Sequence, residues 1–334
     1  MRLLITGAAG YLGSKLLERL TTESCDDTGL DTAAPDDTAP DDTAVLVATD
    51  IRVPSPEQRR PGVVYRPLDV RDPKLADVVQ EYAIDTVVHL AAVVNPGPES
   101  RREEEYSIDV GGTENVLEAC RLHGVRRLVV TSSGAAYGYH ADNPEWLSEE
   151  HPLRGNAAFP YAHHKRLVEA LLARHRDEHP ALGQVVLRLG TVLGAGTQNQ
   201  ITHLFDKPRL LGIRGGDDRF VFIWDEDVAA CLEHAVRSSV TGIFNVAGDG
   251  ALSMGELARR MGKPHISLPA PLVRLALSIA KPLRLSRYGP EQVRFVQYRP
   301  VLDNTRLKRD FGFTPSKTSS EVFDLFWSAR CGAV

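Results

Sequence analysis

The chain has 334 residues, of which 43% are hydrophobic, so it is long enough to bury a sizeable core. Its formal net charge of −5 argues against a nucleic-acid partner, since neutralising phosphates requires clustered Lys and Arg. No apolar run approaches the ~20 residues of a membrane-spanning helix, and the 4 cysteines form no C-x-x-C pair. We therefore expect a cytoplasmic protein with reduced thiols, no metal site and, because an apolar strand begins at residue 3, no signal peptide.

The N-terminal sequence, MRLLITGAAGYLGS, predicts a strand, a glycine turn and a helix in succession. In a dinucleotide-binding fold, Gly7 would allow the tight turn, Gly10 would let backbone N–H groups approach a pyrophosphate, and Gly13 would let the helix pack closely on the strand. The pyrophosphate would then lie at the positive end of the helix. The cofactor-binding residues predicted here are Gly7, Gly10, Tyr11, Leu12 and Gly13. The alternative is a glycine-rich turn that binds nothing, which the rest of the chain disfavours.

Residues 22–44 are rich in Asp, Thr, Ala and Pro, contain no Lys or Arg, and repeat the pentad PDDTA in tandem. Such an acidic, low-complexity segment cannot offset its ordering entropy by burial. We therefore interpret it as a mobile surface insertion, with a functional acidic tether as the alternative.

The sequence predicts a strand at residues 45–49, and Asp50 follows it directly. Dinucleotide folds place an acidic residue at the end of the second strand, where it accepts hydrogen bonds from the adenosine ribose. Asp50 lies further from the glycines than the usual ~20 residues, and the insertion accounts for the difference. A carboxylate there repels the 2′-phosphate of NADP and so favours NAD, with the reservation that Arg52 could bind that phosphate.

Strands and helices alternate from residue 63 to residue 189. The predicted strands are 63–67, 86–92, 127–132 and 184–189, and the predicted helices are 73–82, 103–122 and 161–178. This alternation predicts an α/β fold with a doubly wound parallel sheet, the Rossmann architecture. We place this domain at residues 1–190, completed by about 220–247. His89, inside a buried strand, is better explained as a hydrogen-bonded core histidine than as a ligand.

Residues 191–219 and 248–330 predict a smaller, mostly helical substrate lobe over the carboxyl ends of the strands. The helices predicted near its C-terminal end are 253–261, 271–280, 290–298, 304–310 and 319–329. The stretch 271–285 is apolar and basic and could lie on a membrane surface. We favour a cap helix packed on the sheet lobe, and therefore expect no membrane partner.

One cluster of chemically useful side chains lies at the start of the helix 161–178. Tyr161 and Lys165 are separated by four residues, so they share a helix face. A phenol has a pKa near ~10, which an adjacent ammonium and the positive charge of an oxidised nicotinamide would lower. Tyr161 could then exchange a proton with a substrate hydroxyl near neutral pH. His163 and His164 point elsewhere on the helix and are expected to be solvated.

A second cluster, Thr131-Ser132-Ser133, lies at the carboxyl end of the strand 127–132. Hydroxyls at that end of a parallel sheet can donate hydrogen bonds to a substrate oxygen as charge develops on it. A serine nucleophile would instead need a G-x-S-x-G elbow, which Ser133 lacks. We therefore interpret Ser133 as a hydrogen-bond donor.

In their order and spacing, the motifs of this chain resemble those of the extended short-chain dehydrogenase/reductase superfamily. The motifs are the glycine turn, Asp50, Leu90-Ala91-Ala92, Thr131-Ser132-Ser133 and the Tyr161/Lys165 pair. More narrowly, the chain resembles the NAD-dependent epimerase/dehydratase family, which includes UDP-glucose 4-epimerases. The segment TGAAGYLG corresponds to the family's T-G-x-x-G-x-x-G, and the resemblance extends through Asp303-Asn304 to the last helix.

The resemblance implies roles for individual residues. Tyr161 would be the catalytic acid/base, Lys165 would bind the nicotinamide ribose and tune Tyr161, and Ser133 would hold the substrate oxygen. The resemblance also implies a homodimer formed through the helices 103–122 and 161–178. The further residues implied are Asp69, Val70, Leu90, Ala91, Ala92 and Thr131 for the cofactor, and Ser132 and Arg219 for the substrate.

Several positions depart from the pattern of nucleotide-sugar epimerases. Asp109 stands where that pattern has Asn, and the run 187–194 lacks its Pro and Tyr. Three functions therefore remain in view. We favour hydride transfer in an NAD-dependent, nucleotide-sugar epimerase-like enzyme. The alternatives are an NAD(P)-dependent dehydrogenase or reductase of a non-nucleotide alcohol or ketone, and a non-catalytic dinucleotide-binding regulator.

Overall fold

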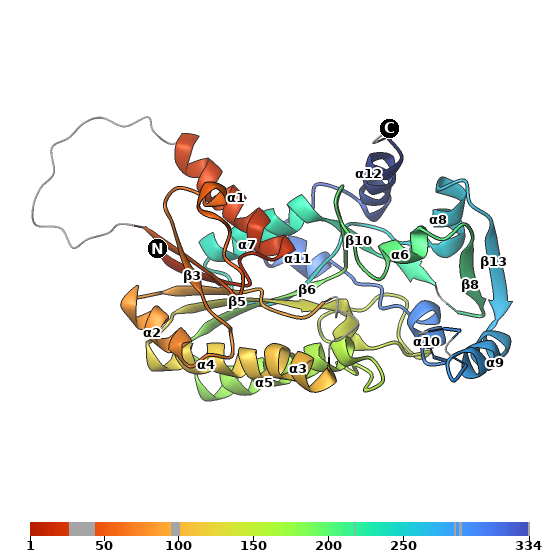
Figure 1. The fold of residues 1–334 in the computed structure, drawn as a ribbon, viewed down its shortest axis with the longest axis horizontal. Coiled ribbons are helices and arrows are strands. Elements are labelled where there is room, and N and C mark those ends of the chain that lie inside the picture. The colour runs from red at the N-terminus through yellow and green to blue at the C-terminus, as the bar shows by residue number, and fades with distance from the viewer. Residues whose placement is uncertain (27–43, 95–100, 217, 284, 287–288, 333–334) are drawn as a thin grey trace, which may run out of the picture. The chain divides into compact units, whose positions relative to one another are not determined.

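The computed structural model of the chain describes residues 1–26, 44–94, 101–216, 218–283, 285–286 and 289–332 (Figure 1). These residues form two compact units. Unit 1 comprises Met1–Thr131, Leu167–Leu187 and Val228–Ile243, and unit 2 comprises Ser132–Arg166, Arg188–Asp227 and Phe244–Val334. Most of the acidic insertion predicted at residues 22–44 lies outside the described residues. Its first five positions belong to the helix α1, which runs to Asp26.

Unit 1 is built on a seven-stranded sheet with the strand order β11-β6-β5-β4-β1-β2-β3. The strands are β1 (Arg2–Thr6), β2 (Val45–Asp50), β3 (Val63–Pro67), β4 (Thr86–His89), β5 (Arg127–Ser133), β6 (Gly183–Leu189) and β11 (Gly242–Val246). The pairs β1–β2, β1–β4, β2–β3 and β4–β5 all run parallel. The doubly wound parallel sheet predicted from the sequence is therefore confirmed.

Helices cover both faces of this sheet, which explains why its strands are continuous apolar runs. The helices of this part of the chain are α1 (Tyr11–Asp26), α2 (Lys74–Glu81), α3 (Arg102–Tyr106), α4 (Gly112–Leu122), α5 (Pro160–Glu178) and α7 (Asp225–Arg237). In Figure 1, α2 and α4 lie on one face of the strands and α1 on the other. Leu4 of β1 and Val47 of β2 are fully buried in the resulting core.

Two elements of unit 1 differ from the sequence-based prediction. The strand predicted at 86–92 ends at His89, because the next residues turn against the glycine loop. The helix predicted at 103–122 is interrupted by a π-helical turn at Ser107–Gly111. His89 itself behaves as expected, since its ring nitrogens lie 2.7 Å from the Thr6 hydroxyl and 3.1 Å from the Thr113 hydroxyl.

Unit 2 contains six short strands among its described residues, and those outside the region around residues 220–223 were not predicted from the sequence. Its strands are β7 (Thr191–Leu193), β8 (Leu210–Arg214), β9 (Arg219–Phe220), β10 (Phe222–Trp224), β12 (Leu252–Ser253) and β13 (His265–Pro269). Its helices are α6 (Thr202–Phe205), α8 (Met254–Arg260), α9 (Ala270–Ala280), α10 (Gln292–Gln297), α11 (Thr305–Arg309) and α12 (Ser319–Gly332). Strands of two to five residues have too few positions for a recognisable period.

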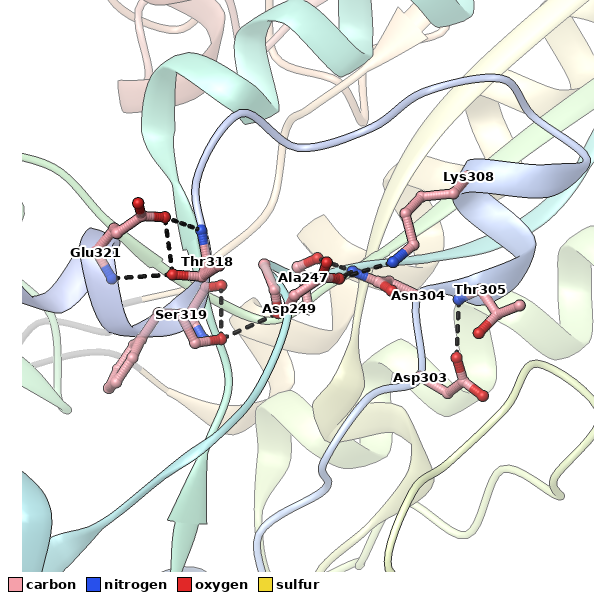
Figure 2. A network of polar contacts seen from close by, with 11 residues as sticks. Ala247, Asp249, Asp303, Asn304, Thr305, Lys308, Thr318, Ser319 and Glu321 are labelled. Carbon is pink, nitrogen blue, oxygen red and sulfur yellow. Dashed lines mark hydrogen bonds and ion pairs between the residues drawn. The ribbon is translucent and has the colours of Figure 1, made fainter.

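Polar contacts tie the C-terminal segment of unit 2 to the loop that follows β11 (Figure 2). The Asn304 amide donates to the Ala247 carbonyl and to the Asp249 carboxylate, both at 2.7 Å. Lys308 donates to the same carboxylate at 2.8 Å. The hydrogen bond from Lys308, and to a smaller extent that from Asn304, lowers the pKa of Asp249. The segment Asp303–Lys308 is thus held by charge-assisted bonds as well as by packing.

Within the described residues, no helix combines the length and the apolar character needed to cross a bilayer.

Candidate active site

The glycine turn of unit 1 is formed by close approaches that only glycine permits. Gly7 has a φ of +70°, and a Cβ placed there would lie 2.6 Å from the Ala91 nitrogen. A Cβ at Gly13 would collide with the Gly7 carbonyl oxygen and with Ala8. The Gly10 N–H donates to the Gly7 carbonyl at 3.0 Å and closes the turn. Tyr11 and Leu12 then begin α1, where the first N–H groups have no acceptor within the helix and can face an anion.

We expect Gly7→Ala to lower the free energy of unfolding by more than the cost of placing an alanine in the left-handed backbone conformation. An alanine in this conformation costs roughly 1–3 kcal/mol, and here the new methyl would also push against the Ala91 backbone. Gly62→Ala is the matched control, since Gly62 has a φ of +73° but nothing within 4 Å of its added Cβ. Urea denaturation measures both variants. Equal losses of unfolding free energy would contradict the packing role of Gly7.

Asp50 lies beside this turn, as the dinucleotide-binding interpretation requires. Its Oδ2 accepts a hydrogen bond from the Ala9 N–H at 3.1 Å, and its Oδ1 accepts one from the Arg52 N–H at 3.0 Å. Each carboxylate oxygen has a second lone pair, so these bonds orient the group without exhausting it. A glycine turn with a carboxylate fixed next to it fits the phosphates and ribose of a dinucleotide.

Asp69 and Val70 follow β3 and contact different neighbours. The Arg71 guanidinium binds the Asp69 carboxylate through two bonds, of 2.9 and 2.6 Å, and donates to the Ser107 hydroxyl at 3.0 Å. The hydrogen bond from Arg71 lowers the pKa of Asp69, which is therefore anionic at neutral pH. The Val70 side chain packs on α4, where a Cβ at Gly112 would lie 2.6 Å from it.

Asp109 is a structural link that the sequence analysis recorded only as a departure from the family pattern. This carboxylate is 2% exposed and accepts a hydrogen bond from the Val93 N–H at 2.8 Å. The bond ties the π-helical turn to Val93, the residue that follows the segment Leu90–Ala92, which the resemblance assigns to the cofactor. The last predicted cofactor residue of unit 1, Thr131, is buried near the end of β5.

In unit 2, Ser133 ends β5 and begins the 3₁₀ turn Gly134–Tyr137. The Ser133 hydroxyl oxygen accepts a hydrogen bond from the Ala135 N–H at 3.1 Å. This bond fixes the oxygen and leaves the hydroxyl proton available for donation. Ser132, by contrast, is 2% exposed, so Ser133 is the more accessible of the two.

Tyr137, the last residue of the same turn, is held in place by hydrogen bonds of its side chain. Its buried hydroxyl accepts a hydrogen bond from Arg188 at 2.7 Å and lies 2.9 Å from both the Ser148 carbonyl and the Asn245 side-chain oxygen. Burial raises the pKa of Tyr137 to about 12. This phenol therefore stays neutral and acts as a structural anchor rather than as an acid or base.

Tyr161 and Lys165 lie at the start of α5, as the sequence predicts. The Lys165 ammonium is 5.8 Å from the centroid of the Tyr161 ring, and the lysine is only 5% exposed. A buried ammonium close to a phenol favours the phenolate form. The expectation that His164 is solvated is wrong, because this side chain is 1% exposed and faces the interior of the protein.

The arginine predicted to bind a substrate diphosphate, Arg219, is engaged by protein groups. Its guanidinium donates to the Glu145 carboxylate at 2.9 Å and lies 5.7 Å from the Trp146 ring centroid. Because Glu145 is largely exposed, this ion pair is screened by solvent and is easily exchanged for another anion.

Arg299 is a second candidate anion-binding arginine of unit 2, and the sequence did not identify it. Its guanidinium stacks on Phe220 and Phe295, 4.5 and 4.8 Å from their ring centroids. Its Nη2 lies 3.4 Å from the Thr191 hydroxyl, whereas its buried Nη1 has no hydrogen-bond partner among the described residues. Burial lowers the pKa of Arg299 to about 10, so the group remains cationic at neutral pH. A buried cation without a counter-ion is costly unless a ligand supplies one.

Aromatic contacts connect Arg299 with the elements that carry the predicted catalytic residues. Phe295 packs on Tyr139 at 5.1 Å, and Tyr139 packs on Phe159 at 5.0 Å. Phe159 comes immediately before α5, which carries Tyr161, and Tyr139 follows the turn that begins at Ser133. One aromatic cluster of unit 2 therefore connects the segments that carry Ser133, Tyr161 and Arg299.

Among the described residues, no group of three or more His, Cys, Asp or Glu side chains has the arrangement of a metal site.

The sequence profile of the NAD dependent epimerase/dehydratase family matches residues 3–247. The chain belongs to this family. The family is NAD dependent, and NAD is therefore the cofactor of this chain, as the glycine turn and Asp50 predict. The family match covers both the residues predicted to bind the cofactor and the Ser133, Tyr161 and Lys165 set.

One relative matches almost the whole chain, and another matches about half of it. An uncharacterized protein of Mycobacterium tuberculosis is 25% identical over 330 residues, which are 98% of this chain and 83% of that protein. A UDP-glucose 4-epimerase of Mycolicibacterium smegmatis is 31% identical over 180 residues, about half of each chain (53% and 52%).

Solved structures share the fold at lower sequence identity. The UDP-glucose 4-epimerase of Thermotoga maritima, solved with UDP-glucose, gives a TM-score of 0.71 at 17% identity, covering 100% of this chain and 99% of that one. The UDP-glucose 4-epimerase of Thermus thermophilus, solved with NAD, gives 0.70 at 23% identity, covering 100% of both chains. At these sequence identities, the two comparisons show that the fold is shared.

Proposed function

We propose that this family member is an enzyme that reversibly oxidises a secondary alcohol, and that its substrate is a nucleotide sugar that it epimerises. The observation that carries the proposal is the Tyr161/Lys165 pair at the start of α5, with a buried ammonium 5.8 Å from the phenol ring. A pair of this kind is suited to proton exchange with a hydroxyl.

The residues of unit 2 divide the proton chemistry between them. The Tyr161 phenolate takes the proton of the substrate hydroxyl as the carbinol becomes a ketone, and returns it when the ketone is reduced. Lys165 keeps the phenolate form accessible by its charge. The Ser133 hydroxyl donates a hydrogen bond to the same substrate oxygen, because its own oxygen is held by the Ala135 N–H.

The residues of unit 1 would hold the cofactor. The glycine turn and the start of α1 would face the pyrophosphate, and Asp50 would accept hydrogen bonds from the adenosine ribose. Asp69 would lie beside the adenine, and Leu90–Ala92, tied down by Asp109, would line the nicotinamide half. When bound, NAD supplies a reversible two-electron oxidation at a carbon that carries a hydroxyl.

Arg299 supports an anionic substrate. Its charge is uncompensated among the described residues, and aromatic contacts connect it with the elements that carry Ser133 and Tyr161. A diphosphate would supply the missing acceptors, and a planar guanidinium binds two phosphate oxygens at once. Arg219, released from Glu145, would be a second donor to the same group.

A net dehydrogenase or reductase acting on a non-nucleotide alcohol or ketone is the second candidate. The ion pair between Arg219 and Glu145 favours this candidate. A substrate without a diphosphate does not need Arg219 as a second phosphate-binding arginine, so Arg219 can stay paired with Glu145. A non-catalytic regulator is the least supported, because nothing in a purely regulatory role explains Ser133, Tyr161 and Lys165 together.

The experiment that tests the proposal is to incubate the purified protein with UDP-glucose, without added cofactor, and to separate the sugar products. The account predicts conversion to an epimer with no net change in the bound nicotinamide. If only added NAD(P) supports turnover, and of a non-nucleotide alcohol, the second candidate replaces the first.

We expect NAD to bind more than about tenfold more tightly than NADP, because the 2′-phosphate would meet the Asp50 carboxylate. Asp50→Asn keeps the shape of the side chain and an acceptor for the Ala9 N–H but removes the charge. This variant should therefore reduce the difference between the NAD and NADP affinities. Titrations of each cofactor into wild type, Asp50→Asn and Arg52→Ala measure the ratio. A wild-type preference for NADP that is lost in Arg52→Ala would contradict the role of Asp50.

We also propose that the protein is a homodimer formed through α4 and α5, as the resemblance implies. Two-fold pairing is the commonest symmetry of soluble oligomers. Light scattering at micromolar concentration should therefore give twice the chain mass of 36.7 kDa. A monomer at that concentration would rule out this proposal.

A further inference from the structure

The helix α9 presents an apolar face to the outside of unit 2. Leu272, Leu275 and Ile279, which share one side of the helix, are 58%, 59% and 55% exposed. The opposite side packs inward through Ala270, Val273 and Leu277, against Ile213 and Val293. The sequence predicts that this helix packs on the sheet lobe. It packs instead on β8 and α10 of unit 2, and on one side only. Leucine and isoleucine are seldom left exposed together along one side of a helix unless something binds there.

Two further exposed leucines follow the end of α9 in the chain. Leu283 and Leu285 are 62% and 80% exposed, and we call them, with Leu272, Leu275 and Ile279, the α9 patch. The neighbouring strand β13 adds Ile266 and Leu268, each 37% exposed. Figure 1 shows α9 next to β13, which pairs with β8 in register Ile266↔Leu211. Half of the exposed large apolar side chains of the described chain lie in these few elements.

The charge around the α9 patch is positive, although the chain as a whole carries −5. Residues 257–290 contain seven Lys and Arg and no Asp or Glu. Arg274 is exposed on α9 beside the patch, and no carboxylate of the described residues pairs with it. Lys281 is bound by Glu291 at 2.9 Å and Arg260 by Asp324 at 2.5 Å. Part of this charge is therefore compensated, and Arg274 is left without a carboxylate among the described residues. The partner of this surface should be both apolar and anionic.

We propose that the α9 patch docks the protein on the surface of a bilayer that contains anionic phospholipids. The leucine and isoleucine side chains would enter the boundary between headgroups and acyl chains, and Arg274 would reach the phosphates. A second copy of the chain fits less well, because a two-fold contact through this face would bring two sets of cations together. This surface is independent of the proposed reaction. It departs from the prediction of no membrane partner, because exposure on α9 could not be read from the sequence.

Flotation of the full-length protein with lipid vesicles tests this proposal. Wild type should bind vesicles of phosphatidylcholine mixed with phosphatidylglycerol, should bind phosphatidylcholine alone weakly, and should be released by salt. The triple variant Leu272→Ser/Leu275→Ser/Ile279→Ser should lower vesicle affinity by at least about 100-fold, since three side chains no longer enter the bilayer. Arg274→Gln should weaken binding only to the anionic vesicles.

Leu325→Ser is the matched control, because this leucine of α12 is also exposed (45%) but lies outside the α9 patch. It should bind vesicles as wild type does, and the melting temperatures of all variants should be unchanged, because every substituted side chain is exposed. The proposal is overturned if wild type floats with neither vesicle. The proposal is also overturned if the triple variant binds vesicles as wild type does. A change in the oligomeric state of the triple variant by light scattering, together with a wild type that does not bind vesicles, would overturn it in favour of a contact between copies of the chain.

Discussion

Replacing Tyr161 by Phe is expected to lower kcat by about 10²–10⁴-fold, because general acid–base catalysis by one positioned group contributes this much. The change removes only the hydroxyl that is proposed to exchange the proton. The Tyr161 ring should keep its place near the Lys165 ammonium, 5.8 Å from the ring centroid. Folding and NAD affinity should therefore stay close to wild type, as measured by thermal unfolding and by cofactor titration.

Tyr137→Phe provides the comparison for this variant. It also removes a phenol hydroxyl, but one that is buried and bound by Arg188 rather than placed for catalysis. It should destabilise the fold by about 1–3 kcal/mol, because the buried guanidinium loses an acceptor, and it should affect kcat less. If Tyr161→Phe retained more than about a tenth of the activity, another group would be the acid/base.

Replacing Arg299 by Met is expected to separate stability from substrate binding. The variant removes a guanidinium whose Nη1 is buried and which has no counter-ion among the described residues, and Met keeps favourable contacts with Phe220 and Phe295. The free energy of unfolding should therefore be unchanged or rise by up to ~2 kcal/mol. The kcat/KM for a diphosphate-linked substrate should fall by about 10²-fold, since charge-assisted bonds to the phosphates are lost.

Arg188→Met is the matched control, because Arg188 is also buried but has protein acceptors. It donates to the Tyr137 hydroxyl at 2.7 Å and to the Glu149 carbonyl at 3.1 Å. Its loss should destabilise the fold by roughly 2–4 kcal/mol, because buried acceptors are left unpaired. If Arg299→Met were equally destabilising and left KM unchanged, Arg299 would be a structural residue and the case for an anionic substrate would fail.

Features of the fold that depend on local sequence could be predicted. The glycine turn is one, because Gly7 and Gly13 are required by contacts with residues close in the chain or in the adjacent strand. The position of Asp50 is another, since β2 carries it to the same end of the sheet as the turn whatever the length of the insertion. Long runs of alternating strand and helix patterns predicted that the sheet is parallel and doubly wound.

Features that depend on distant contacts could not be predicted. Arg299 is one arginine among many in the sequence, and only the packing of Phe220 and Phe295 around it reveals a buried charge. The burial of His164 likewise depends on which side of α5 faces the interior. The pair β8–β13 joins segments about fifty residues apart, so neither strand has a local signal that identifies it.

The central claim is that Tyr161 and NAD act together on a substrate alcohol, and one spectroscopic measurement tests it most directly. The purified protein with its nicotinamide bound is mixed with UDP-glucose, and the absorbance of the nicotinamide is followed, in parallel with Tyr161→Phe. The account predicts a transient change in wild type that returns to baseline as product forms, and a change at least about 10²-fold slower in the variant. Bound NAD whose absorbance never changes with UDP-glucose, or with any other nucleotide sugar or alcohol, would contradict the account.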